Sequence, residues 1–389
     1  MRVLALIPSF FGWTGNAVNE RQLVTALAKK VEKCYVITFV GFKQVFTDRR
    51  RELKVSLPKN IMLIPLLFPQ VHILIIYLAM IVISCIMSIL GLILCALKKI
   101  NLVYIRNSFL SMGFLTFKSL AEKTIVKIPA IIEDEIPNDG LTKFFIGKAA
   151  DLLDRLTLAR ARKVAVNNES LYDEIVKRRF LKHRDNPVEI PPGVNLQTIR
   201  QVKKRISREP HHKFINVGFI GSLNWWQGVD ILVKAVTLLR KKITNLRLVI
   251  IGDGELRPLI EKTCKASNTP YEITGFLPHE EALRRLAMLD VLVLPSRKMT
   301  SAEFNIPIKV IEAWALGVPV IVARHHALIR NNIRNFEHVI YCKPEPINVA
   351  NCISTLLNND YLKSRLKVNG EKLVGRFDYD KIAEKLLMV

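Results

Sequence analysis

Short runs rich in Val, Ile and Leu alternate with amphipathic segments of helical length along nearly the whole chain. In those segments the apolar residues recur three or four positions apart, which predicts helices. Alternation of buried strands with helices is typical of parallel sheets covered on both faces. In the first half, the pattern predicts strands at residues 3–7, 34–40, 61–67, 102–106, 130–134 and 163–167.

The same pattern restarts in the second half, after a stretch that resembles a linker. Residues 191–213, PPGVNLQTIRQVKKRISREPHHK, are rich in proline and charge. Beyond them, strands are predicted at residues 214–221, 246–254, 271–277, 291–296 and 319–323. We therefore predict an α/β protein with two Rossmann-like, doubly wound domains at residues 1–195 and 196–375.

One apolar run, HILIIYLAMIVISCIMSILGLILCAL at residues 72–97, contains no charged residue. Its neighbours, residues 61–67 and 102–106, are predicted strands of one sheet, so a single membrane crossing would separate them. Two crossings need about 40 residues, which the run does not supply. It is either a helix packed on the sheet or a monotopic helix at a membrane interface. We favour the second, because one face of a sheet cannot bury a helix that is apolar all round.

The chain is strongly basic, with 58 Lys and Arg, 34 Asp and Glu, and a formal net charge of +24. That charge suits nucleic acid, anionic lipid or phosphorylated ligands, or it is only a solvated basic surface. The chain contains no zinc-finger, RNP-like or zipper-backed basic motif, which argues against nucleic acid. Basic clusters beside the apolar run, such as residues 49–51 and 98–99, fit an anionic membrane surface better.

Two further features bear on location. The six cysteines form no C-x-x-C motif and have no His partner at zinc spacing, so we expect a reducing compartment. The N-terminus, MRVLALIPSFFGW, lacks a small-residue cleavage site and is interpreted as a first strand. We therefore expect a cytoplasmic protein, peripheral or monotopic at the membrane.

Glycines follow two strands of the second half, in GSLNWWQG at residues 221–228 and GDG at residues 252–254. Glycine lets backbone N–H groups approach an anion closely, and the helix that follows carries partial positive charge at its N-terminus. Each motif alone is equally compatible with a simple turn.

The order and spacing of four segments are more specific than either glycine motif alone. These segments are FIGSLNWWQGVDILVKA, LVIIGDGELRPLIE, ITGFLPHEEALRRLAMLDVLVLPS and PIKVIEAWALGVPVIVA. Together, over residues 214–325, they resemble the donor-binding half of family 4 glycosyltransferases, retaining enzymes of the GT-B fold. The first half resembles that family more loosely, through the loop SFFGWTGNAVNE. The resemblance implies two domains that face each other across a cleft, with a C-terminal helix, residues 376–389, that crosses back to an acceptor-side first domain.

The resemblance also implies a nucleotide-diphosphate sugar as donor and assigns residues to it. Glu312 corresponds to the acid that binds the ribose hydroxyls, and an ionised carboxylate can accept two hydrogen bonds from a diol. Gly221 and Gly252 correspond to glycines near the diphosphate and the base. Phe276 and Gly15 are further donor-binding candidates by position.

The chain departs from the family where cations grip the diphosphate. The usual Arg and Lys are replaced by Ser222 and Gln227. Lost charge-assisted hydrogen bonds are worth roughly 1.5 to 3 kcal/mol each. As a hypothesis, Lys309 or Lys298 replaces the missing cations.

The catalytic candidates are acids. The family pairs two glutamates eight positions apart, but Phe304 stands eight before Glu312, and Glu303 is one residue off. Either a bulge restores Glu303 near the donor sugar or the first acid is absent. Glu133 and Asp134, after a predicted strand, could hold the acceptor or take its proton, or they belong to a solvated acidic loop.

These observations favour a retaining glycosyltransferase that moves a hexose to a lipid-linked or glycolipid acceptor at the membrane surface, with no metal. Two alternatives remain open. One is a nucleotide-sugar 2-epimerase of the GT-B fold, which would release free sugar nucleotide. The other is a non-catalytic GT-B subunit, with which the missing cations are compatible.

Overall fold

The computed structural model describes residues 1–8, 10, 15–41, 57–68, 73–107, 110–131, 140–178, 187–206, 214–297 and 304–389. Within these ranges, residues 16, 41, 67–68, 73–85, 112, 140–146 and 150 are described by their backbone alone. The chain forms two compact units: Met1–Pro191 together with Asp380–Val389, and Pro192–Tyr379. The boundaries that the sequence predicts fall after residues 195 and 375.

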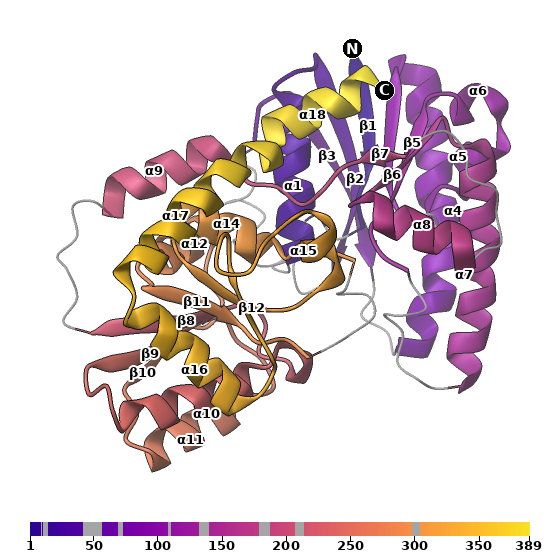
Figure 1. Ribbon diagram of the computed structural model, residues 1–389. Helices are drawn as coiled ribbons and strands as arrows, with labels where there is room; N and C mark the ends of the chain where they lie inside the picture. Colours follow the sequence, from indigo (N-terminus) through magenta and orange to yellow (C-terminus); the bar gives the residue numbers. More distant parts are fainter. Residues whose placement is uncertain are drawn as a thin grey trace. The chain divides into compact units, whose positions relative to one another are not determined.

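The first unit is built on a parallel sheet, to which the described residues contribute seven strands in the order β3-β2-β1-β4-β5-β6-β7 (Figure 1). The strands are β1, Arg2–Leu6; β2, Lys33–Gly41; β3, Ile61–Phe68; β4, Leu102–Arg106; β5, Thr124–Ile128; β6, Lys163–Val166; and β7, Val188–Glu189. The helices are α1, Gly15–Ala28; α4, Ile73–Lys98; α5, Met112–Thr116; α6, Lys118–Ala121; α7, Gly140–Arg160; α8, Glu169–Arg178; and α18, Tyr379–Met388.

Helix α4 carries the apolar run as one continuous helix. Side chains of its second half pack with the sheet and with α5, and Gly91 is so close to α5 that a Cβ there would lie 2.2 Å from the ring of Phe114. Helices α4, α5 and α7 form one layer beside the sheet, and α1 lies on the sheet's other side (Figure 1). Among the described residues, no helix is both long enough and apolar enough to cross a membrane.

A buried charge cluster joins α1 to the sheet in the first unit. Glu20 is 1% exposed, and its Oε1 lies 3.3 Å from Lys127 Nζ and 3.1 Å from Arg106 Nε. The Tyr104 hydroxyl donates to the other carboxylate oxygen at 3.0 Å. Burial lowers the pKa of the Lys127 ammonium, which Glu20 opposes. Removing one partner of such a buried ion pair strongly destabilises a protein, because the remaining charge is left in an apolar environment.

The second unit has its own parallel sheet, with six described strands in the order β10-β9-β8-β11-β12-β13. The strands are β8, Ile215–Ile220; β9, Leu246–Ile251; β10, Tyr271–Ile273; β11, Val291–Leu294; β12, Val320–Ala323; and β13, Ile340–Cys342. The helices are α9, Leu196–Ile206; α10, Val229–Arg240; α11, Arg257–Ala266; α12, His279–Ala287; α14, Ile308–Leu316; α15, His326–Arg330; α16, Pro346–Leu357; and α17, Asp360–Val374.

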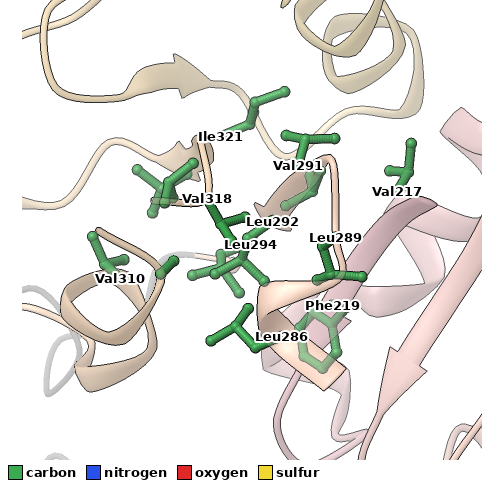
Figure 2. Packing of buried hydrophobic residues seen from close by; sticks show 14 of the residues in the cluster. Val217, Phe219, Leu286, Leu289, Val291, Leu292, Leu294, Val310, Val318 and Ile321 are labelled. Atoms are coloured by element: carbon green, nitrogen blue, oxygen red, sulfur yellow. The ribbon is translucent and has the colours of Figure 1, made fainter. Parts of the chain in front are cut away.

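Helices α12 and α14 lie on one face of this second sheet and α10, α11 and α16 on the other. Figure 2 shows Leu286 of α12 and Val310 of α14 pointing into the same apolar cluster as β11. A Cβ at position 218 of β8 would lie 2.3 Å from the side chain of Leu289, so the glycine there gives room for this residue, which follows α12. This packing fixes the N-termini of α12 and α14 at the carboxyl edge of the sheet, where ligands bind in such folds.

Two predicted elements were wrong. The strand predicted at residues 130–134 does not include Ala130 or Ile131, and residues 132–134 lie outside the described residues. A strand instead occupies Thr124–Ile128 and ends before Pro129, which cannot donate a ladder hydrogen bond. The predicted linker contains α9, whose Ile199 and Val202 are buried on the core of the second unit. The two parallel sheets themselves confirm the predicted pair of Rossmann-like domains.

Candidate functional site

Two glycine loops, after β8 and β9, form the base of the candidate site. Gly221 N donates to Ile251 O at 2.9 Å, and both Gly221 and Gly252 have left-handed backbones, with φ of +141° and +143°. A Cβ on Gly252 would lie 2.0 Å from the carbonyl oxygen of Gly221. The close approach of these two loops therefore requires glycine at position 252, whatever binds beside them.

Lys309, in the first turn of α14, reaches back to the loop that follows β8. Its Nζ donates to Gln227 Oε1 at 2.8 Å and lies 4.8 Å from the centroid of the Phe219 ring. A Cβ on Gly221 would be only 2.7 Å from that nitrogen. Desolvation lowers the pKa of the Lys309 ammonium to about 8, and attraction by Glu312 opposes this. The structure thus brings Lys309, Gln227 and Gly221 together, as the hypothesis of a replacement cation requires.

Glu312 lies one helical turn after Lys309 and is 6% exposed. Its Oε1 is 2.7 Å from Nε2 of His279, the first residue of α12. The sequence did not point to His279, because its partner is 33 positions away and the contact depends on how α12 and α14 pack. The one available signal was a polar residue at the start of the helix after β10.

The loop after β10 lies beside the loop after β9. Gly275 forms an isolated antiparallel bridge with Gly252, and the next residue, Phe276, has a side chain that is 60% exposed. Asp253 is held by Arg257, whose Nη1 lies 2.9 Å from Asp253 Oδ2. Phe276 thus offers an accessible aromatic face next to the Gly252 loop, which is suitable for stacking on a planar base.

The N-terminus of α10 completes this edge of the sheet. Gly228 caps the helix in a left-handed conformation, with φ of +71°. Arg297, which follows β11, makes two hydrogen bonds to Asp230 in the first turn, at 2.9 and 2.7 Å. Its guanidinium also lies 4.7 Å from the ring centroid of Trp225. Asp230 balances the charge of Arg297, so Lys309 is the better candidate for an incoming anion.

The remaining predicted residues fall into three groups. Ser222 lies at the start of the same loop, where its Oγ accepts from Asn224 Nδ2 at 3.3 Å. Gly15 is the exposed first residue of α1 in the other unit. Glu303, Glu133, Asp134 and Lys298 lie outside the described residues. Phe304, which stands where the family has its first glutamate, makes an edge contact with the ring of His326 at 6.0 Å.

A resident metal has no evident ligand set here: within the described ranges, no three His, Cys, Asp or Glu side chains gather as a metal site needs. The polar groups at this edge are suited to other tasks. A buried carboxylate can accept hydrogen bonds from hydroxyl groups, and an ammonium beside glycine N–H groups can bind an anion.

Comparison with known sequences identifies a family match within the second unit. A family model described as Glycosyl transferases group 1 matches residues 215–359. An uncharacterized glycosyltransferase of Methanocaldococcus jannaschii is 23% identical over 254 residues, which are 62% of this chain and 63% of that protein. A GDP-mannose-dependent alpha-(1-6)-phosphatidylinositol dimannoside mannosyltransferase of Mycobacterium tuberculosis is 31% identical over 148 residues, 37% of each chain. The matches thus span less than two thirds of the length of either relative.

Solved structures are similar over nearly the full length. Sucrose-phosphate synthase from Thermosynechococcus elongatus has a TM-score of 0.74 and 17% identity, and the match covers 100% of this chain and 98% of that one. Anabaena HepE in complex with UDP and glucose has a TM-score of 0.70 and 14% identity, with coverage of 100% and 98%. At these identities the likeness concerns the fold. The chain therefore has the GT-B fold, and residues 215–359 of its second unit match the glycosyltransferase group 1 family model.

Proposed function

We propose that this protein is a retaining glycosyltransferase that transfers a hexose from a nucleotide-diphosphate sugar to a lipid-linked or glycolipid acceptor at the cytoplasmic face of a membrane. The observation that carries the proposal is the pair of charges on α14, Lys309 beside the Gly221 loop and the buried Glu312 one turn later. Relatives and structural neighbours add support: one relative uses GDP-mannose, and HepE holds UDP and glucose.

The proposed roles follow from the charges of the two groups. In transfer, the bond between the sugar C1 and the diphosphate oxygen breaks, and the diphosphate leaves with the electron pair. The acceptor oxygen bonds to C1, and its proton passes to the departing diphosphate. Lys309 and the N-terminus of α10 would stabilise the negative charge on the leaving diphosphate. Glu312 would bind the ribose hydroxyls, and Phe276 would stack on the base. No metal is included in the proposal.

The membrane part of the proposal rests on α4. Ile86, Ile89, Ile93 and Leu97 are 45%, 57%, 47% and 70% exposed, and their spacing of three and four residues places them on one face. The opposite face is buried against the sheet and α5. Lys98 and Lys99 follow at the end of the helix and are exposed. An apolar stripe that ends in basic residues is suited to the interface of an anionic bilayer.

A transfer assay tests the proposed reaction. The purified chain is incubated with UDP-, GDP- and ADP-sugars and a membrane lipid extract, and both lipid and free nucleotide sugar are analysed. We expect a glycosylated lipid whose formation is lost in Glu312→Ala. Release of a 2-epimer of the nucleotide sugar would identify an epimerase instead. Nucleotide binding without turnover in any combination would identify a non-catalytic subunit.

Vesicle binding tests the membrane contact separately. Ile89→Glu and Ile93→Glu place charges in the middle of the α4 stripe and should reduce co-sedimentation with anionic vesicles. Ile347→Glu, an exposed apolar position of the second unit that is 69% exposed, is the matched control and should have no effect. Equal loss in all three variants, or no binding by the wild type at low salt, would contradict the proposed membrane contact.

A further inference from the structure

The contact between His279 and Glu312 has no place in the roles assigned so far. His279 Nε2 lies 2.7 Å from Glu312 Oε1, while the His279 side chain is 26% exposed and that of Glu312 is 8% exposed. The imidazole is therefore more exposed than the carboxylate that it contacts. An ionised carboxylate at such a site requires hydrogen-bond partners, because an unpaired buried charge is expensive.

The fold determines this contact in advance of any ligand. Leu283 and Leu286 hold α12 on the core, and Val310 and Ile311 hold α14 on the same core. Both helices begin at the carboxyl edge of the sheet, which places the first residue of α12 opposite the first turns of α14. Contacts between packed helices are preorganised, so they cost little to maintain when a ligand binds.

The hydrogen-bonding capacity of Glu312 leaves room for a ligand. An ionised carboxylate has about four lone-pair positions on two oxygens. His279 occupies one of them with its Nε2–H, which restricts rotation of the carboxylate about its last bond. The remaining positions can accept hydrogen bonds from the two neighbouring hydroxyls of a ribose.

We propose that His279 is a positioning residue that donates its Nε2–H to Glu312 and fixes the plane of the carboxylate for the donor ribose. This inference rests on the proposed function, in which Glu312 binds that ribose. Its consequence is selectivity at the 2′ position: a fixed carboxylate distinguishes ribose from 2′-deoxyribose, because the deoxy sugar leaves one acceptor position unused.

The experiment measures dissociation constants by calorimetry on the full chain, for UDP and 2′-deoxy-UDP and for GDP and 2′-deoxy-GDP. The wild type should bind the ribose form of its preferred nucleotide about tenfold more tightly than the deoxy form. His279→Ala should weaken binding of the ribose form about tenfold and reduce that preference to about twofold. His279→Gln has an amide nitrogen that can donate from nearly the same place. It should therefore keep most of the affinity for the ribose form and most of the preference for ribose over deoxyribose.

Glu280→Ala is the matched control, because Glu280 is the next residue of α12 and its side chain is 47% exposed. It should leave affinity and preference unchanged. Thermal unfolding of every variant identifies any that is not folded, and His279→Gln keeps the test decisive if His279→Ala does not fold.

Two outcomes would overturn the inference and leave the nucleotide site intact. In one, Glu312→Ala loses the ribose preference but both His279 variants keep it. In the other, His279→Ala binds the nucleotide more tightly, which would mean that the imidazole competes with the ribose. If the wild type binds none of the four nucleotides and does not bind ADP, or if Glu312→Ala retains wild-type affinity and preference, the proposed function itself fails.

Discussion

Substituting Lys309 by Met should weaken nucleotide-diphosphate binding and, at the same time, raise the free energy of unfolding. The ammonium lies in a desolvated place, between the Phe219 ring and Gln227, and its opposing charge on the same helix is Glu312. Met is similar in length and keeps the packing of the stem but removes the charge. The substitution should therefore increase stability but decrease affinity. The buried charge destabilises the free protein, and it contributes favourably only when an anion is bound.

The magnitudes follow from the pKa. Lowering it from 10.5 in the unfolded chain to about 8 in the folded protein corresponds to roughly 3 kcal/mol at about 1.4 kcal/mol per pKa unit. This is the cost of holding the charged form, so Lys309→Met should be more stable by up to that amount at pH 7. Loss of a charge-assisted hydrogen bond to phosphate, worth roughly 1.5 to 3 kcal/mol, should weaken UDP binding about 10- to 100-fold.

The pH dependence gives a second signature. Between about pH 8 and 10.5 the unfolded chain holds a proton on Lys309 that the folded protein has lost, so this residue makes stability rise with pH in that window. Binding behaves oppositely: the negatively charged diphosphate favours the charged lysine, so UDP affinity should change little between pH 7 and 8 and fall above about pH 8. Titration calorimetry from pH 6.5 to 9.5 measures this, and urea denaturation measures the stability.

Two variants make the test specific. Lys309→Arg keeps its charge over the whole range and should remove the loss of affinity above pH 8. Lys265→Met, at an exposed lysine of α11, should change neither affinity nor stability. The reasoning is refuted if Lys309→Met binds UDP as tightly as the wild type, or if wild-type affinity does not change between pH 7 and 9.5.

Three further predictions concern the fold and the membrane contact. Gly252→Ala would place a methyl group 2.0 Å from the carbonyl oxygen of Gly221. Urea denaturation should show that the second unit is less stable by roughly 2 kcal/mol or more, and nucleotide affinity should be reduced. A variant as stable as the wild type would contradict the loop geometry. Glu20→Gln should lower the free energy of unfolding by roughly 3 to 5 kcal/mol, because it leaves the charge of Lys127 buried and uncompensated. An unchanged denaturation midpoint would show that this cluster does not hold α1 on the sheet. Vesicle binding of the wild type should be weaker at 0.5 M than at 0.05 M salt, because the Debye length becomes about threefold shorter and the basic residues are screened. The Ile89→Glu variant should bind weakly at both salt concentrations. Wild-type binding that does not depend on salt would show that the contact has no electrostatic part.

The sequence predicted the second unit more completely than the first for identifiable physical reasons. Strands β8 and β9 are rich in Val, Ile and Leu and end at Gly221 and Gly252, so residue type and position both mark these strand ends. Lys309 and Glu312 are three positions apart on a helix, which places them on one face without any tertiary information. In the first unit, β5 contains Lys127, and a charged residue inside an apolar run suggests a strand end even though Glu20 neutralises it.

Contacts that depend on packing could not be predicted. Helix α9 has only two buried side chains, Ile199 and Val202, among many charges, so its sequence is typical of a linker until the core of the second unit covers that face. The pairing of His279 with Glu312 requires knowledge of how α12 lies against α14. Nothing in the local pattern of either helix encodes this distance.

A crystal structure of the protein with UDP bound would show whether Glu312 and Lys309 hold the nucleotide. The account predicts both ribose hydroxyls within hydrogen-bond distance of Glu312 and a diphosphate oxygen within reach of Lys309 Nζ, beside the Gly221 loop. The account is contradicted if the nucleotide binds elsewhere, or if Glu312 keeps His279 as its partner while the ribose lies beyond hydrogen-bond distance of the carboxylate.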